Sequence, residues 1–293
     1  MEYDRFQQAQ RTKYDCLLFD LDDTLYPLNS GLATECCKNI EDYMAQNLGI
    51  ERSKISEMSS LLYKNYGTTM AGLRAIGYDF DYDHYHSFVH GRLPYERLKP
   101  DPVLRNLLLS LPLRKVIFTN ADRVHAAKAL GRLGLDDCFE GVICFETLNP
   151  MNKNNVSSDD VDSMFAGSES TTTGFEPFDI VGHFSQPNAG SQLPKTPIIC
   201  KPSEDAFEQA LRIANIDPQR TIFFDDSVRN IQSGKRVGLH TVLVGTSQRT
   251  KGADFALESI HNIREALPEL WEVEEKPEVR YSGDIAMETS VTA

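Results

Sequence analysis

Five short apolar runs, rich in β-branched and aromatic residues, recur along the chain and most are separated by helix-like stretches. They lie at residues 16–19, 115–118, 141–145, 221–224 and 241–245. Runs of this kind suit strands that are buried on both faces, and their alternation with helices indicates βαβ units. The sequence therefore predicts an α/β fold with a doubly wound, mostly parallel sheet, whose ligands bind beyond the carboxyl ends of the strands.

The helical signal is clearest at residues 122–134. Asp122 can cap the amino end and Gly134 can end the helix. The apolar residues between them follow helical spacing and predict the buried face, namely Val124, Ala127, Leu130 and Leu133. Residues 203–214 and 227–238 show the same pattern.

Three segments depart from this alternation. Residues 32–97 have a mainly helical pattern and are far longer than an ordinary connection, so they predict a small helical cap inserted after the first strand. The catalytic core is then expected at 14–31 and 98–268. Residues 151–195 are rich in polar side chains and predict a flexible loop, and 272–293 predict a disordered acidic tail.

Charge and cysteine content limit the classes of partner. The 43 acidic residues outnumber the 30 basic ones, which gives a net charge of −13 and disfavours a nucleic-acid partner. The six cysteines include no C-x-x-C spacing, which favours a reducing compartment. No apolar run is long enough to span a bilayer, so we expect a cytoplasmic protein without a membrane partner. The sequence leaves the oligomeric state open.

Polar motifs directly follow three of the apolar runs. They are residues 20–24, reading DLDDT, then Thr119-Asn120, then residues 225–227, reading DDS. The first motif could be a solvated acidic turn. A calcium loop is excluded, because Leu25 and Gly31 stand where such a loop needs Gly and Glu.

A third interpretation of the acidic turn is a magnesium-dependent site for phosphoryl transfer. Mg²⁺ prefers oxygen ligands from one or two carboxylates, completed by water and substrate phosphate. Asp20 and Asp22 could then divide the work, one attacking and one handling protons. The other groups needed are neutral donors for phosphoryl oxygens, a cation and further metal ligands, and the chain offers Thr119 and Asn120, Lys201, and Asp225 and Asp226.

These motifs, in this order, resemble those of the haloacid dehalogenase (HAD) superfamily. The resemblance runs from residue 14 to 268 without 151–195. Within the superfamily, FDLDDTLYP, NYGTTMAGL and DDSVRNIQSGKRVG are similar to the pyrimidine 5′-nucleotidase branch. The resemblance to the superfamily implies a HAD-like Rossmannoid core with a cap.

The resemblance also implies a role for each motif residue. Asp20 would be the nucleophile and Asp22 the general acid and base. Thr119, Asn120 and Lys201 would bind phosphate, with Thr119 and Lys201 stabilising charge in the transition state. Mg²⁺ would be held by the Asp20 side chain, the Asp22 main-chain oxygen and Asp226, with Asp225 as a further or water-mediated ligand.

The implied reaction is hydrolysis of a nucleoside 5′-monophosphate, pyrimidine or purine such as xanthosine monophosphate, through an aspartyl-phosphate. In the cap, Tyr66 could stack on the base and Arg74 could meet a ring carbonyl. Alternatively, Tyr66 packs in the cap core and Arg74 lies on a solvated helix face. Alternative functions are a phosphatase for a sugar phosphate or lysophosphatidic acid, and a non-catalytic phospholigand-binding protein.

Overall fold

The computed structural model describes residues 13–150, 177–185 and 192–272. Its centre is a six-stranded parallel sheet with the strand order β3-β2-β1-β4-β5-β6. The strands are β1 (Cys16–Phe19), β2 (Arg114–Phe118), β3 (Gly141–Ile143), β4 (Thr221–Asp225), β5 (His240–Val244) and β6 (Phe255–Leu257). The chain builds β2 and β3 on one side of β1 and then β4 on the other. This makes the β1–β4 neighbourhood a topological switch point, where ligands bind in open sheets.

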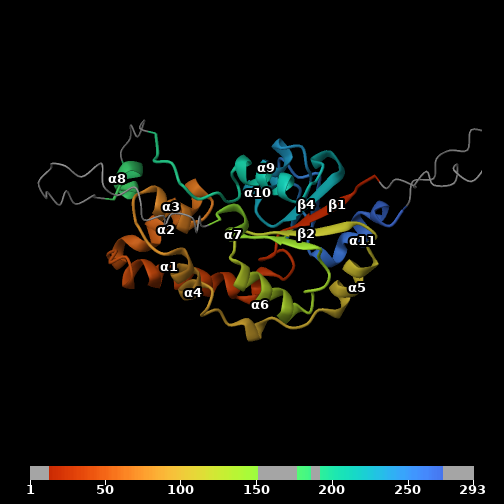
Figure 1. Ribbon diagram of the computed structural model, residues 1–293, viewed down its shortest axis with the longest axis horizontal. Coiled ribbons are helices and arrows are strands. Elements are labelled where there is room, and N and C mark those ends of the chain that lie inside the picture. Colours follow the sequence, from red (N-terminus) through yellow and green to blue (C-terminus); the bar gives the residue numbers. More distant parts are fainter. Residues whose placement is uncertain (1–12, 151–176, 186–191, 273–293) are drawn as a thin grey trace, which may run out of the picture.

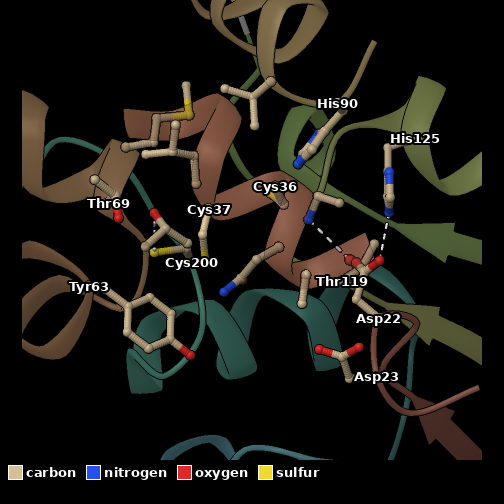
Figure 2. A pocket seen from close by; sticks show the side chains of 18 of the residues that line it. Asp22, Asp23, Cys36, Cys37, Tyr63, Thr69, His90, Thr119, His125 and Cys200 are labelled. Carbon is tan, nitrogen blue, oxygen red and sulfur yellow. Dashed lines mark hydrogen bonds and ion pairs between the residues drawn. The ribbon is translucent and has the colours of Figure 1, made fainter. Parts of the chain in front are cut away.

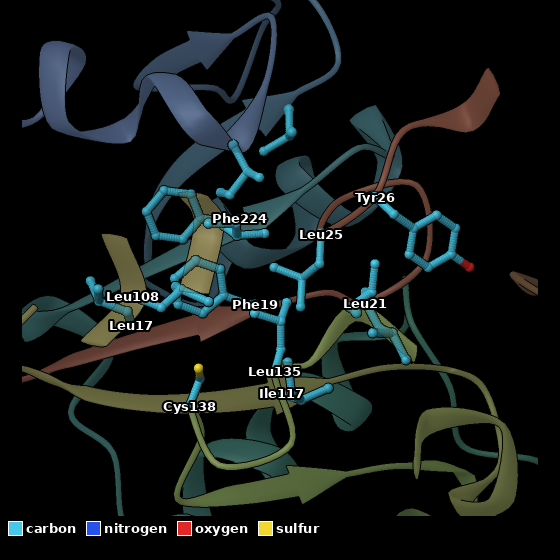
Figure 3. Packing of buried hydrophobic residues seen from close by; sticks show 14 of the residues in the cluster. Leu17, Phe19, Leu21, Leu25, Tyr26, Leu108, Ile117, Leu135, Cys138 and Phe224 are labelled. Carbon is cyan, nitrogen blue, oxygen red and sulfur yellow. The ribbon is translucent and has the colours of Figure 1, made fainter. Parts of the chain in front are cut away.

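Helices cover both faces of the sheet (Figure 1). One face carries α5 (Pro102–Ser110), α6 (Arg123–Leu133) and α11 (Ile263–Ala266), and the other carries α7 (Phe145–Leu148), α9 (Glu204–Ile213) and α10 (Val228–Arg236). Figure 3 shows the first of these two cores, where Phe19 stacks on Phe224 with ring centroids 4.6 Å apart. Short 3-10 helices lie at Leu28–Ser30, Tyr95–Arg97, Pro218–Arg220, Ile260–Asn262 and Pro268–Leu270.

The region between β1 and β2 forms a helical unit with its own apolar core. Its helices are α1 (Leu32–Gln46), α2 (Arg52–Tyr66), α3 (Thr69–Ala75) and α4 (Tyr82–Val89). Tyr43, Met44 and Leu62 are among the side chains buried between them. We call this unit, residues 32–97, the cap.

The expectation of a flexible polar loop over 151–195 is wrong for part of that range. Residues 180–185 form helix α8 (Ile180–Ser185), which packs against α2. Ile180 is fully buried, and the main-chain N–H of Phe178 donates to the carbonyl of Ile76 at 2.8 Å. Apolar side chains in an otherwise polar stretch thus fasten it to the cap. The other parts of the predicted loop, 151–176 and 186–191, lie outside the described residues, as does the predicted tail from residue 273.

The structure confirms the predicted strands and adds the short β6, which the sequence analysis missed. It also confirms the helix at 122–134, in which the Asp122 side chain caps the first turn and Gly134 is left-handed. The predicted buried face is partly wrong, because Val124 is 59% exposed while His125 is buried. A polar side chain can occupy that face because its ring nitrogens have hydrogen-bond partners there.

Within the described part of the chain, no helix combines the length and apolar character needed to cross a bilayer.

Candidate active site

The ends of β1, β2 and β4 bring Lys201 and two aspartates together. Lys201 Nζ lies 2.9 Å from Asp20 Oδ1 and 2.8 Å from Asp225 Oδ2, and it donates to the main-chain oxygen of Phe118 at 2.7 Å. Its side chain is only 1% exposed. Because an unpaired buried charge is costly, these three acceptors keep the ammonium in place, and its pKa is raised by the two carboxylates against the effect of burial.

Three carboxylates of this edge form a candidate metal centre. Asp20, Asp225 and Asp226 each offer an oxygen within 4.8 Å of the others. Burial and the neighbouring carboxylates raise the pKa of Asp20 above its usual range, although Lys201 opposes this. Desolvation and the carboxylates of Asp225 and Asp23 raise the pKa of Asp226 to about 7. One ammonium does not balance this crowding, so hard oxygen donors and excess negative charge fit a divalent cation such as Mg²⁺.

Asp225 differs from Asp226 in how many protein donors it already accepts. Its Oδ1 accepts from the main-chain N–H of Ser227 at 2.8 Å and from Asn230 Nδ2 at 3.0 Å, while Oδ2 accepts from Lys201. Asp225 is fully buried, whereas Asp226 is exposed to the cavity. Asp226 is thus the more available ligand, and Asp225 mainly holds Lys201 in position.

Thr119 and Asn120 follow β2 but have different surroundings. Thr119 lines the cavity, and its hydroxyl oxygen accepts the N–H of Ala121 at 3.0 Å. The Asn120 amide is used by the protein: Nδ2 donates to the Lys201 carbonyl at 3.0 Å and Oδ1 accepts the Lys201 N–H at 2.8 Å. The Asn120 side chain thus positions Lys201, and the phosphate-binding role predicted for Asn120, which lines the cavity, stays a prediction.

A second asparagine, Asn149, binds the main chain two residues before Lys201 in the same way. Asn149 Nδ2 donates to the carbonyl of Ile199 at 2.9 Å, and Oδ1 accepts the Ile199 N–H at 2.8 Å. Two side-chain amides therefore bind alternate residues of the segment that leads into Lys201, as the main chain of a neighbouring strand would.

Asp22 has its own environment, apart from the metal centre. Its Oδ1 lies 2.6 Å from His125 Nε2 and also accepts the hydroxyl of Tyr26 (Figure 2). Burial alone would raise the pKa of Asp22, but the charge and hydrogen bond of His125 and the hydroxyl of Tyr26 hold it below its usual range. Sequence analysis missed His125. A histidine in the first turn of a helix that follows a polar strand end was the available signal.

A cavity of about 450 Å³ separates these strand ends from the cap. Its core side includes Asp20, Asp22, Thr119 and Lys201. Figure 2 shows Tyr63 and Thr69 of the cap across the cavity from Asp22. Helices α2 and α3 and the turn between them contribute hydroxyl groups to the lining, from Ser56, Ser59, Ser60, Tyr63, Thr68 and Thr69. The rest of the cap adds ionisable side chains such as Glu41 and His90 and apolar ones such as Ile40 and Val89.

The structure does not support the two predicted substrate residues of the cap, since neither described side chain lines the cavity. The Tyr66 hydroxyl donates to the carbonyl of Pro194 at 3.0 Å, and its ring packs against the cap core. Arg74 pairs with Asp79 and donates to the carbonyl of Tyr78 at 3.0 Å. Both side chains are thus turned toward other parts of the protein and away from the cavity.

Comparisons with known proteins show which proteins this chain is similar to. The family described as haloacid dehalogenase-like hydrolase matches residues 164–238. Phosphate metabolism protein 8 of Saccharomyces cerevisiae is 29% identical over 132 residues, which are 42% of this chain and 41% of that protein. The match thus spans about two fifths of the length of this curated relative.

Two solved structures of low sequence identity are similar to this chain, and the first of them shares its fold. CbbY from Rhodobacter sphaeroides, in complex with phosphate, is 16% identical with a TM-score of 0.51, covering 88% of this chain and 99% of its own. A HAD phosphatase from Thermococcus onnurineus is 16% identical with a TM-score of 0.48, covering 86% of this chain and 96% of its own. The haloacid dehalogenase-like hydrolase family thus matches the part of the chain that includes Lys201 and Asp225, and the chain shares its parallel α/β fold with CbbY.

Proposed function

We propose that this protein is a Mg²⁺-dependent phosphatase that hydrolyses a nucleoside 5′-monophosphate through an aspartyl-phosphate. The observation that carries the proposal is the contrast between two aspartates at the end of one strand. Asp20 lies beside Lys201 and the metal centre, while Asp22 is turned to His125. The match of residues 164–238 to the hydrolase family supports this reaction class, as does the relative named for phosphate metabolism.

In the first half-reaction a carboxylate oxygen of Asp20 attacks the phosphorus and forms a new O–P bond. Asp22 must be protonated for this step, although His125 and Tyr26 hold its pKa below the usual range in the free protein. The bond from phosphorus to the leaving oxygen breaks, its electron pair stays on that oxygen, and Asp22 gives the oxygen a proton. In the second half-reaction water attacks the phosphorus and gives a proton to Asp22. The bond to Asp20 then breaks, which restores the carboxylate and releases inorganic phosphate.

Fixed charges of the core assist both half-reactions. The Lys201 ammonium and the Thr119 hydroxyl stabilise negative charge on the phosphoryl oxygens. Mg²⁺ would be held by the Asp20 side chain, the Asp22 main-chain oxygen and Asp226, with Asp225 as a further or water-mediated ligand. When bound, it supplies positive charge between two anions that would otherwise repel each other.

The cavity supports a leaving group of nucleoside size. A volume of about 450 Å³ lies in the range of small-molecule sites. The cap lines it with neutral hydroxyl groups, which suit the hydroxyl and amide groups of a ribose and a base. A sugar phosphate would use the same hydroxyls, so it is the second candidate. The cap also lines the cavity with apolar side chains such as Ile40, Met70 and Val89, so lysophosphatidic acid stays an alternative that the substrate panel tests.

The experiment is phosphate release from a panel of nucleoside monophosphates, sugar phosphates and lysophosphatidic acid, with Mg²⁺ and then with a chelator. We expect chelator-sensitive release concentrated on a nucleoside monophosphate. Asp20→Asn keeps the side-chain shape but removes the nucleophile, so its release should fall to that of the chelated enzyme. Asp136→Asn, at an exposed loop residue, is the control and should match the wild type.

Substantial turnover by Asp20→Asn would remove Asp20 from the nucleophile role. No release from any substrate with Mg²⁺ present would favour a non-catalytic phospholigand-binding protein.

A further inference from the structure

Behind Asp22 lies a chain of buried hydrogen bonds that the reaction scheme leaves unexplained. His125, in the first turn of α6, has a side chain that is only 3% exposed. Its Nε2 is 2.6 Å from Asp22 Oδ1, and its Nδ1 is 2.8 Å from the hydroxyl of Tyr95. Both nitrogens of the ring are thus bonded, one to Asp22 at the cavity (Figure 2) and one to Tyr95 near the end of the cap.

The hydrogen bonds of Tyr95 determine the orientation of the imidazole. The Tyr95 hydroxyl donates to the main-chain oxygen of His90 at 3.1 Å. A hydroxyl has one proton, so toward His125 it must act as acceptor, and Nδ1 must carry a hydrogen. The ring therefore cannot turn over without losing this bond, and Nε2 is held facing Asp22.

The carboxylate of Asp22 is fixed in the same way. Its Oδ1 is hydrogen-bonded to His125 Nε2 and accepts a hydrogen bond from the Tyr26 hydroxyl. Oδ2 receives no hydrogen bond from a described residue, and the Asp22 side chain stays 36% exposed. Because the bonded oxygen faces α6, the free oxygen is the one that the cavity can use.

We propose that His125 is a positioning residue, which holds the Asp22 carboxylate so that Oδ2 meets the leaving oxygen and later the attacking water. This inference rests on the proposed phosphatase function and assigns a cause to the different roles of Asp20 and Asp22. Both half-reactions need Asp22 in one place, and a displacement of 1 Å can cost about 10²-fold in rate.

The test compares two variants on two kinds of substrate. His125→Leu removes both ring nitrogens, while His125→Gln keeps an N–H donor that can reach Asp22. A nucleoside monophosphate loses an alkoxide that needs a proton, whereas p-nitrophenyl phosphate loses a phenolate that leaves without one. Rapid mixing follows the appearance of p-nitrophenol, and thermal unfolding of each variant reports on the fold.

For His125→Leu we expect turnover of the nucleoside monophosphate to fall about 10²-fold with little change in KM. On p-nitrophenyl phosphate the first half-reaction should keep its wild-type rate while the second slows. The variant should then show a burst of about one p-nitrophenol per active site, followed by a slow steady state. His125→Gln should recover to within about tenfold of the wild type, and it carries the test if the leucine variant does not fold.

Equal losses on both substrates without a burst would overturn the proposal, since a buried histidine that only supports the fold would act on both alike. A double variant with Asp22→Ala gives a second readout. If His125 acts through Asp22, removing it should add no further loss to Asp22→Ala, whereas an additive loss would also overturn the proposal. Failure of the phosphatase function itself is distinct, because the wild type would then release phosphate from no substrate.

Discussion

The core wall and the cap wall of the cavity are built on different principles. On the core wall, charged groups hold one another, as Lys201 does with Asp20 and Asp225. On the cap wall, the part formed by α2 and α3 presents neutral hydroxyls, such as those of Ser59 and Thr69, which lie 3.3 Å apart. Preorganised charge serves the reaction itself, while adaptable hydroxyls serve recognition of the leaving group. Substitutions on the two walls should therefore differ in which kinetic constant they change.

The largest effect is expected from Lys201→Met on the core wall. The change leaves the buried carboxylates of Asp20 and Asp225 without their cation, so the free energy of unfolding in chelator should fall by about 3 kcal/mol. Turnover should fall by about 10³-fold, since a fixed charge near the phosphoryl group is lost. Urea unfolding and steady-state kinetics measure both, with the exposed Lys251→Met as control. A rise in KM without a fall in turnover would show that Lys201 contributes only to substrate binding.

A smaller effect is expected where the two walls meet. Gly67 ends α2 with φ of +89°, and a Cβ there would collide with the main-chain oxygen of Lys201. Gly67→Ala should push the cap away from Lys201 and lower kcat/KM by about tenfold. Gly49→Ala is a matched control, because Gly49 also has a positive φ, +67°, with no atom within 4 Å of a Cβ.

The control should cost about 1 kcal/mol in the free energy of unfolding and leave activity unchanged. Equal activity of the two alanine variants would show that the contact between Gly67 and Lys201 does not matter for catalysis.

The smallest effect is expected on the cap wall itself. Ser59→Ala removes one cavity hydroxyl and should raise KM about fivefold at nearly constant kcat, since a neutral hydrogen bond contributes about 1 kcal/mol. Ser53→Ala, on the exposed part of the same helix, should leave both constants unchanged. A fall in kcat without a change in KM would show that the cap takes part in the reaction and not only in recognition.

The core wall was easier to predict from the sequence than the cap wall. Asp20, Thr119 and Asp225 each follow an apolar run, and the ends of parallel strands meet at one edge, so local pattern indicates proximity. Cap residues have no such rule. Tyr66 and Arg74 were chosen by residue type, but which way a helix turns depends on packing with distant partners such as Pro194.

The same limit explains the errors elsewhere. His125 is polar, and a pattern of apolar residues placed Val124 on the buried face in its stead. Only the partners Asp22 and Tyr95, far from His125 in the sequence, make its burial favourable. Helix α8 was missed because its few apolar residues have meaning only against the cap surface that they cover.

The side-chain amides of Asn120 and Asn149 together hold the main chain of residues 199–201. Asn120 binds the N–H and carbonyl of Lys201, and Asn149 binds those of Ile199. These four hydrogen bonds fix the main-chain position from which the Lys201 side chain extends. The position of the lysine is thus determined locally and not by the path of the chain that precedes it. Residues 199–201 are therefore aligned by two side-chain amides and not by pairing with a strand.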